Sequence, residues 1–400
     1  MHNNTSVASV SAGETCFVIA QKSPFFIVGG GQVPDQGWVT VNGVETPITN
    51  VRFIGNAIAA QIVAPASISV GDQIVSQVDK AWRTKAMKNH TATHLLQAAL
   101  IELFGNSIQQ SGSLVHPDYL RFDFTYHQQL SLTDIKRVED LVNEKIRENI
   151  GVTIEYCSLK EAQKKGALAF FGEKYKPENV RMVRVDEFSV ELCGGTHVYA
   201  TGEIGAFKIT ESVALSAGHR RIFAVTGPGA IDLFQETFNT VKALSQDYKV
   251  KREEVLEAVT KQKEQLRFAQ QEIKQLRQQL LAAQIPHMLE NVEQIKSIPF
   301  LCVYDTGMSA EDMRGLVTML EQKQPGFYFV YNHGLPSEPV SFYTAISSQF
   351  AHTLDMKQFS TWLQTQGLRG GGSKNSIQGG GEKFNPQLCV AIKQWIEQQQ

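Results

Sequence analysis

The spacing of hydrophobic and polar residues changes along the chain and predicts four regions. From Cys16 to about Val78, short apolar runs such as TCFVIA, GWVTVNGV and DQIVSQV are separated by Gly, Pro, Asn and Asp. Short apolar runs between turn-forming residues are typical of antiparallel strands. The first region therefore predicts a small β-domain, which we expect to be an antiparallel β-barrel.

The second region combines helices and strands. The run KNHTATHLLQAALIELFG has apolar residues at helical spacing and stops at Gly105, so it predicts a helix. Strand-like runs such as YLRFDFTY and VRMVRV alternate with a predicted helix from about Leu132 to Asn149 and a short one near Leu159 to Lys165. We expect an α+β domain that ends near Pro228.

A long polar-rich helix is predicted for residues 230–284, and Pro286 is expected to end it. Its seam residues are spaced alternately four and three apart: Val255, Val259, Gln262, Leu266, Ala269, Ile273, Leu276 and Leu280. Such a sustained period of 3.5 residues predicts a coiled coil.

The last region alternates strand-like runs (FLCVYDT, GFYFVYN) with helical runs (AEDMRGLVTMLEQ, MKQFSTWLQTQ), and two glycine triplets precede a final helix. This pattern predicts a small α/β domain. The whole chain is therefore expected to be an α+β multi-domain protein. Its predicted parts are a β-barrel at 1–84, an α+β domain at 85–228, a helical linker at 229–285 and a glycine-rich α/β domain at 286–400.

Composition changes this picture only slightly. The 400 residues, 42% of them hydrophobic, can bury two or three cores. A net charge of -2 and a pI near 6.6 provide no global attraction for nucleic acid, so RNA binding would depend on local basic patches. The sequence has neither a secretory signal nor an apolar run of the roughly 20 residues that span a bilayer, and its five cysteines are scattered. We expect a cytoplasmic protein with reduced thiols.

Two pairs of residues carry the candidate chemistry. His90 and His94 are four apart in a predicted helix and share one face, while Cys193 and His197 are four apart in ELCGGTHV, whose glycines predict a tight loop. The histidine pair alone is also explained by side chains that pack in a core or face solvent. Together the three imidazoles and the thiolate form a ligand set of the kind zinc prefers, so the sequence predicts a zinc site.

The segments around these residues resemble a known family. HTATH followed about a hundred residues later by CGGTH is similar to the editing domain shared by alanyl-tRNA synthetases and free-standing alanyl-tRNA editing proteins. Further similar segments are SPFFIVGGGQVPDQG, QSGSLVHPDYLRFDF, GALAFFGEKY and SAGHRRIFAVTG. LRGGGSKNSIQGGG resembles the glycine-rich motif of the synthetase C-terminal domain. The resemblance covers nearly the whole chain.

This resemblance implies a zinc-dependent editing reaction. The reaction hydrolyses the ester bond of tRNA(Ala) that carries serine, or glycine, in place of alanine. By analogy, Gln110 and its neighbour Ser111 are candidates for recognising the serine hydroxyl, and Gln32 is a candidate for closing the pocket against the tRNA end. Arg369 and Lys374 in the glycine-rich segment are candidates for contacts with RNA phosphates, with a flexible loop as the alternative. The zinc ion could polarise the ester carbonyl, activate water or anchor the substrate amine, and the sequence does not choose among these roles.

Two other functions are compatible with the sequence. The same domains form the C-terminal half of alanyl-tRNA synthetases, so the chain could be a fragment or subunit that works with a separate ATP-dependent subunit. Because the predicted barrel begins within about twenty residues of Met1, we expect no aminoacylation domain before it. The chain could also be a non-catalytic tRNA-binding or dimerisation module with structural zinc. The coiled-coil seam and the C-terminal domain also predict a homodimer, with a solvated spacer as the alternative role of the long helix.

Overall fold

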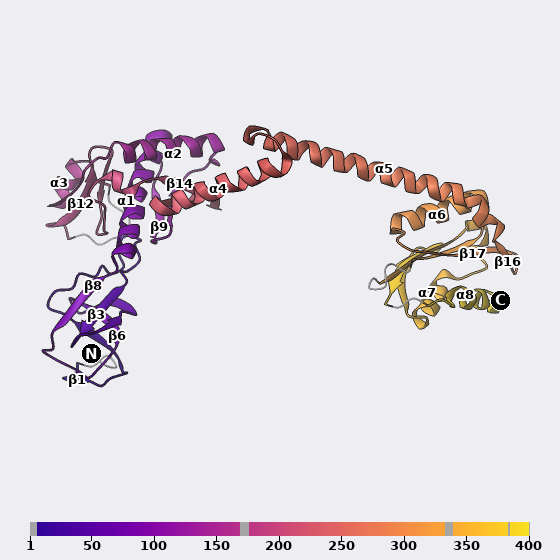
Figure 1. Ribbon diagram of the computed structural model, residues 1–400, viewed down its shortest axis with the longest axis horizontal. Helices are drawn as coiled ribbons and strands as arrows, with labels where there is room; N and C mark the ends of the chain where they lie inside the picture. Colours follow the sequence, from indigo (N-terminus) through magenta and orange to yellow (C-terminus); the bar gives the residue numbers. More distant parts are fainter. Residues whose placement is uncertain (1–5, 169–175, 333–338, 383–384, 400) are drawn as a thin grey trace. The chain divides into compact units, whose positions relative to one another are not determined.

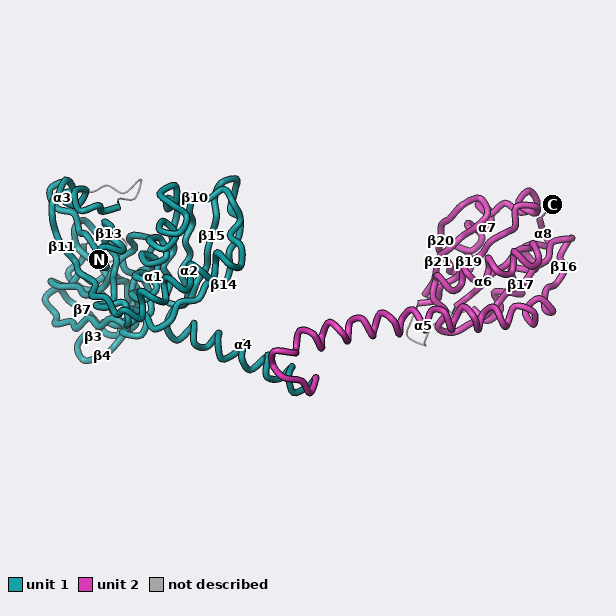
Figure 2. Tube along the Cα trace, turned by 90° about the horizontal axis from the view of Figure 1, so that it is seen from above, with its two compact units in different colours: residues 1–247 teal, residues 248–400 magenta. Residues whose placement is uncertain are grey.

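The computed structural model describes residues 6–168, 176–332, 339–382 and 385–399. The chain forms two compact units, residues 1–247 and 248–400, which Figure 2 shows in different colours. The finer division into four parts at residues 84, 228 and 285 stays a prediction. Most of the segment GALAFFGEKY, residues 169–175, lies outside the described residues.

Antiparallel strands form the N-terminal region, as predicted. One sheet has the order β2 (Thr15–Ile19), β6 (Ala57–Val63), β5 (Asn50–Ile54), a second has β4 (Val44–Pro47), β3 (Gly37–Val41), β8 (Ile74–Val78), and β1 (Ser9–Val10) pairs with β7 (Ile68–Ser69). Val39, Val41 and Ile62 belong to one core that both three-stranded sheets share. The predicted closed barrel is wrong for the described residues, because the two sheets are separate and each keeps its own edge strands.

A single long helix, α1 (Lys80–Phe104), runs through the centre of the first unit (Figure 1). It ends at Gly105 as predicted but begins eight residues earlier than the apolar pattern indicated. The reason is a cap: the Asp79 side chain accepts hydrogen bonds from the backbone N–H groups of Ala81 and Trp82. Its middle part, residues 89–97, is buried on all sides, with Leu95 and Leu96 in the core of the unit.

Two sheets contribute to the surroundings of α1. An antiparallel sheet has the order β14 (Phe207–Ser216), β15 (His219–Thr226), β10 (Leu120–Thr125), β9 (Gln110–Val115), and a smaller one has β11 (Val152–Cys157), β12 (Val180–Val185), β13 (Ser189–Leu192). The helices α2 (Leu132–Arg147) and α3 (Leu159–Lys164) and the 3-10 turn η1 (Thr201–Ile204) complete this part. The structure confirms both helices predicted here. Strands β9 and β13 supply residues of the candidate site.

The predicted single linker helix is two helices, α4 (Gly227–Tyr248) and α5 (Val255–Glu290), with the 3-10 turn η2 (Arg252–Glu254) before α5. Lys249 follows α4 with a φ of 54°, a left-handed conformation that ends a helix. The predicted end at Pro286 is also wrong, since α5 continues past this residue. Leu281 and Ile285 are buried in a core of the second unit, and this packing offsets the hydrogen bond that proline cannot donate.

The second unit is a six-stranded mixed sheet with helices on both faces (Figure 1). The strand order is β16 (Glu293–Ile295), β17 (Ile298–Asp305), β18 (Phe327–Asn332), β19 (Val340–Ile346), β21 (Ser376–Gly381), β20 (Leu368–Gly372), and only β17 and β18 run parallel among these described pairs. α5 and α6 (Ala310–Lys323) pack on one face, whereas α7 (Met356–Thr365) and α8 (Leu388–Gln398) pack on the other, and η3 (Ser348–Phe350) follows β19. All of β18 is buried because alternate residues, such as Phe329 and Val330, enter opposite cores.

The glycine-rich segment LRGGGSKNSIQGGG is a β-hairpin, formed by β20 and β21, so the flexible-loop alternative is wrong. The backbones of the two strands come so close together that some positions have no room for a side chain. A Cβ atom on Gly379 would lie 2.0 Å from the carbonyl oxygen of Arg369. The glycines therefore permit close packing of the hairpin.

The expectation of five reduced thiols is wrong for two of them. Cys302 on β17 and Cys389 on α8 form a disulfide, with Cα atoms 5.8 Å apart. They are 87 residues apart in sequence, and only the packing of α8 on the sheet brings them together. None of the helices in the described ranges is long and apolar enough to cross a membrane.

Candidate metal centre

The helix α1 supplies the first half of the candidate site. His90 and His94 lie on consecutive turns in its buried part and are only 2% and 3% exposed. Their ring centroids are 5.4 Å apart, so the predicted common face is confirmed. Polar side chains buried at this depth usually have hydrogen-bond partners, and Gln32 is the partner of His90.

The segment CGGTH after β13 supplies the second half. It passes so close to α1 that a Cβ atom on Gly195 would lie 1.9 Å from Cε1 of His90. Only glycine fits at this point, whereas the neighbouring Gly194 has open space around it. The loop brings Cys193 and His197 to the two histidines of α1, and both are buried.

The four predicted ligands converge. One donor atom from each of His90, His94, Cys193 and His197 lies within 4.8 Å of the others. The Sγ atom of Cys193 is 3.3 Å from Nε2 of His90 and 3.4 Å from Nε2 of His197. Tetrahedral zinc with ordinary bond lengths would place sulfur and nitrogen about 3.6 Å apart. The set therefore has the dimensions of a zinc site.

The protonation states of the histidines also suit a metal. Burial lowers the pKa of His90 to about 3, with a smaller contribution from the positive charge of Arg181. Burial, followed by the neighbouring histidines, lowers the pKa of His94 and His197 well below 6.5. All three imidazoles are therefore neutral at pH 7, the form in which imidazole binds metals. Nδ1 of His94 is buried and lacks a hydrogen-bond partner among the described residues, so the side chains fit a metal ion.

Three polar side chains lie close to ring nitrogens of the histidines. Oε1 of Gln32 is 2.7 Å from Nδ1 of His90, and Oγ1 of Thr91 is 3.2 Å from Nδ1 of His197. Oε2 of Glu191 is 3.5 Å from Nε2 of His94. Burial raises the pKa of Glu191 to about 8, against the opposing effect of a hydrogen bond from Ser189. His90 and His197 thus each have a polar partner within hydrogen-bond distance that can orient the ring, as is common around zinc.

A cavity of about 240 Å³ opens beside this cluster. His90, His94 and Cys193 line it together with residues 30–31 and 110–113. This volume is below the roughly 300–1,000 Å³ of pockets for drug-sized ligands, so it suits a small group. The two predicted specificity residues, Gln110 and Ser111, lie in its wall, and Nε2 of Gln110 donates to Oγ of Ser113 at 3.2 Å.

Gln32, the residue predicted to close the pocket against the tRNA end, lies behind the His90 ring. Its side chain is 1% exposed, and its amide contacts His90 and Thr196, on the far side of the His90 ring from Cys193 Sγ. It is not part of the described lining of the cavity. Its loop reaches the cavity through Gly30 and Gly31 instead.

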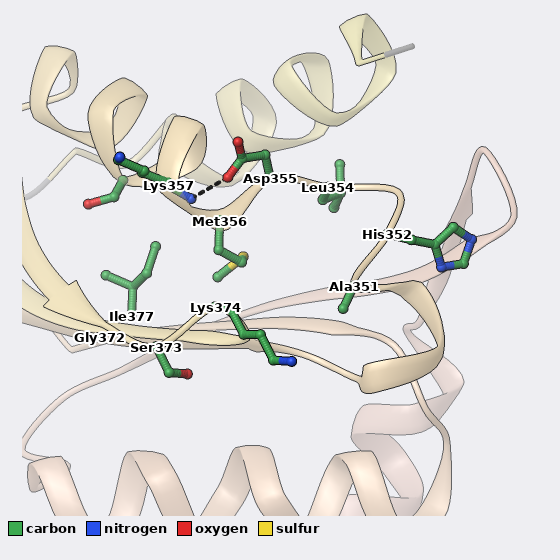
Figure 3. A pocket seen from close by; sticks show the side chains of 11 residues that line it. Ala351, His352, Leu354, Asp355, Met356, Lys357, Gly372, Ser373, Lys374 and Ile377 are labelled. Atoms are coloured by element: carbon green, nitrogen blue, oxygen red, sulfur yellow. Dashed lines mark hydrogen bonds between the residues drawn. The ribbon is translucent and has the colours of Figure 1, made fainter.

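The two candidate RNA-binding residues belong to the second unit. Arg369 is exposed on β20, and Lys374 lies in the turn between β20 and β21. Lys374 borders a pocket of about 550 Å³ between this turn and the start of α7, into which Met356 and Ile377 point (Figure 3). The basic residue Lys357 also lines this pocket.

Sequence analysis missed several residues of the site, although two had a usable signal. Thr93 lines the cavity and lies three residues after His90, a spacing that shares a helix face. Glu191 precedes Cys193 by two residues, and alternate residues of a strand point to the same side. Thr91, Thr196 and Ser113 gave no such signal, because their contacts depend on how distant segments pack.

Comparison with known proteins shows which families the chain resembles. Residues 180–223 match the family "Threonyl and Alanyl tRNA synthetase second additional domain", and residues 1–82 match "tRNA synthetases class II (A)". Three alanine–tRNA ligases are similar over most of the chain. The one from Pseudoalteromonas translucida is 34% identical over 94% of this chain and 43% of its own length, and the one from Carboxydothermus hydrogenoformans is 34% identical over 99% and 45%. The one from Idiomarina loihiensis is 32% identical over 98% and 46%.

The chain spans somewhat less than half the length of these relatives. The solved C-Ala domain of Aquifex aeolicus alanyl-tRNA synthetase aligns with 26% of this chain and 97% of its own, at 18% identity and a TM-score of 0.24, which is too low to bear on the fold. The sequence similarity to the ligases, in contrast, extends over up to 99% of this chain. The chain is therefore related in sequence to alanine–tRNA ligases, with similarity over nearly its whole length.

Proposed function

We propose that the chain is a zinc-dependent deacylase, which hydrolyses the ester that joins serine, or glycine, to tRNA(Ala). One observation carries the proposal: the buried His90, His94, Cys193 and His197 cluster borders a small cavity whose wall includes Gln110. The family relationship supports a substrate related to tRNA(Ala).

The reaction makes modest demands on the protein. The oxygen of a water molecule adds to the ester carbonyl carbon, and the bond to the ribose oxygen breaks with transfer of a proton to that oxygen. This needs a positioned water and stabilisation of the charge on the carbonyl oxygen. A zinc ion held by the four ligands supplies a Lewis acid for the carbonyl or an anchor for the amine. The cavity walls hold the aminoacyl group and restrict access of bulk water.

To hydrolyse the seryl ester and spare the alanyl ester, the site needs a polar group that binds the serine hydroxyl, because alanine differs from serine only by lacking this hydroxyl. Gln110 is suited to this contact, since its amide both donates and accepts hydrogen bonds. In the structure this amide already bonds the hydroxyl of Ser113 in the cavity wall, which holds it in place. A site with a hydrogen-bonding group for the substrate hydroxyl discriminates well against the analogue without one.

The direct test is a deacylation assay with seryl-, glycyl- and alanyl-tRNA(Ala) side by side. We expect hydrolysis of the seryl ester and sparing of the alanyl ester. Cys193→Ala should lose both zinc and hydrolysis while still binding tRNA, because the thiolate is a metal ligand. Cys157→Ala, a half-buried cysteine of the same unit, is the matched control and should keep both. An intact seryl ester after incubation with the zinc-loaded chain would exclude the proposed function and favour a module with structural zinc.

A second candidate is that this deacylase works as a part or partner of an alanine–tRNA ligase. It is favoured by the similarity of the whole chain to ligases that are more than twice as long. Co-purification with an ATP-dependent catalytic subunit, or alanylation of tRNA(Ala) by the mixture, would support it.

Arg369 and Lys374 are the proposed RNA contacts of the second unit. Their replacement should weaken tRNA binding without affecting zinc content.

A further inference from the structure

We infer that Gln32 is a positioning residue of the metal centre, which fixes the His90 ring and the CGGTH loop in the geometry needed to bind zinc. It reaches the centre from the N-terminal β-region, so this region is part of the metal site. The inference rests on the proposed zinc binding but not on the proposed hydrolysis.

The orientation of the Gln32 amide follows from a backbone group. The backbone N–H of Thr196 donates to Oε1 of Gln32 at 3.0 Å, and Nε2 of Gln32 donates to Oγ1 of Thr196 at 2.9 Å. A backbone N–H can only donate, so the amide atom that it meets must be the oxygen. The hydrogen bonds therefore determine which end of the Gln32 amide is oxygen and which is nitrogen.

The oriented amide in turn selects one form of His90. The same Oε1 atom lies 2.7 Å from Nδ1 of His90, and because this oxygen accepts, Nδ1 must carry the proton and donate. In a neutral imidazole the other nitrogen, Nε2, then keeps its lone pair. Nε2 is the atom that faces Sγ of Cys193, at 3.3 Å. Gln32 therefore presents the correct ring nitrogen to the metal.

The loop that carries Gln32 is itself held firmly. The backbone of Val115 on β9 donates to the carbonyl of Gly31 at 2.8 Å and accepts from Val33 at 3.1 Å. Gly31 has a φ of 76°, and a Cβ atom there would lie 2.8 Å from the carbonyl oxygen of Ser113. The loop thus needs glycine to pack against β9, the strand that also carries Gln110.

Contacts with α1 hold the other end of this loop. Buried Asp35 accepts a hydrogen bond from Nε of Arg83 at 2.8 Å, and Nε1 of Trp82 donates to the carbonyl of Pro34 at 3.1 Å. Arg83 and Trp82 lie two turns before His90 on the same helix. The loop is therefore held at both ends, and its Gln32 amide contacts His90 of one half-site and Thr196 of the other.

The test measures zinc affinity by competition with a chromogenic chelator, on the full chain. Gln32→Met keeps the approximate volume but removes the acceptor, and we expect zinc affinity to fall about 10–100-fold, the usual effect of losing a partner of a ligating histidine. Gln32→Glu keeps an acceptor for Nδ1–H and should restore most of the affinity. His219→Ala, a histidine of the same unit outside the centre, is the control and should bind zinc as the unsubstituted chain does.

A second measurement needs no variant and covers the case in which Gln32→Met does not fold. In the zinc-free chain, the ¹⁵N spectrum of the His90 ring should show the proton on Nδ1. A proton on Nε2, or unchanged zinc affinity in folded Gln32→Met, would overturn the inference. Loss of seryl-tRNA hydrolysis in Gln32→Met at full zinc affinity would instead assign Gln32 a substrate contact. A chain that binds zinc in a Gln32-dependent way but leaves the seryl ester intact would contradict only the proposed function.

Discussion

His90 and His94 could be predicted from the sequence because helical spacing places residues four apart on one face. The CGGTH pair could be predicted because its glycines permit a tight loop. The partners of these ligands could not, since Gln32 and His90 are 58 residues apart and meet only when the β-region packs on α1. Local spacing thus identified the candidate ligands, and tertiary packing determines how they are oriented.

The two glycines of the CGGTH loop should differ in their tolerance of a side chain. Gly195→Ala should abolish zinc binding, because the added Cβ would lie 1.9 Å from Cε1 of His90 and displace this ring or the loop. Gly194→Ala should bind zinc normally, since nothing lies within 4 Å of its Cβ position. Zinc content measured by mass spectrometry of the native protein checks both. Equal zinc content in the two variants would show that the loop does not pack against His90 as described.

Gln110 should determine selectivity without affecting the metal. In Gln110→Ala the hydrolysis rate of seryl-tRNA should fall about 10–100-fold, the loss expected for one hydrogen bond worth about 1–3 kcal/mol. Glycyl-tRNA, which lacks the hydroxyl, should be hydrolysed at an unchanged rate. Gln109→Ala, an exposed neighbour, is the control. A parallel loss for both substrates would show that Gln110 has another role.

At the scale of elements, the sequence predicted most helices well and some strands poorly. α2 and α7 were expected at nearly their observed positions, since both have a clear apolar stripe and a capping residue. β20 and β21 were missed because glycine triplets have low strand propensity, and only pairing with β19 and with each other forms them. The extension of α5 beyond Pro286 was missed for a similar reason, as buried contacts overrode the local signal.

The disulfide between β17 and α8 should stabilise the second unit. It closes a loop of 87 residues, for which chain entropy gives up to about 4–5 kcal/mol. A reductant should therefore increase hydrogen exchange in α8 and β17, measured by mass spectrometry. Cys302→Ser/Cys389→Ser is the control, and its exchange should not respond to reductant. If the unsubstituted chain also fails to respond, the disulfide does not contribute to stability.

At the scale of the whole molecule, the α+β class and the succession of regions were predictable, but sheet closure was not. Alternating apolar residues indicate that a strand has one buried face, and they do not specify which strands pair. Two sheets around one core and a closed barrel therefore give the same pattern. The N-terminal region adopts the former arrangement.

The seam of α5 should mediate association of two chains. Leu266, Ile273, Leu276 and Leu280 are 51–60% exposed, an unusual state for a row of large apolar side chains. We expect a dimeric mass in light scattering at micromolar concentration, and a shift toward monomer in Leu266→Lys. Gln271→Lys, on the opposite side of the helix, should leave the mass unchanged. A monomeric mass for the unsubstituted chain would exclude the seam as a dimer interface.

The metal centre gathers segments that are far apart along the chain. His90 and Cys193 are 103 residues apart, and Gln32 and Thr196 are 164 apart. Closing loops of this length costs entropy that only the completed fold offsets, and contacts of this range form slowly. During synthesis the second half-site leaves the ribosome long after the first, and neither half-site alone provides four ligands. We therefore expect zinc to enter late, after folding of the first unit, so that metal content reports whether newly made chains have matured.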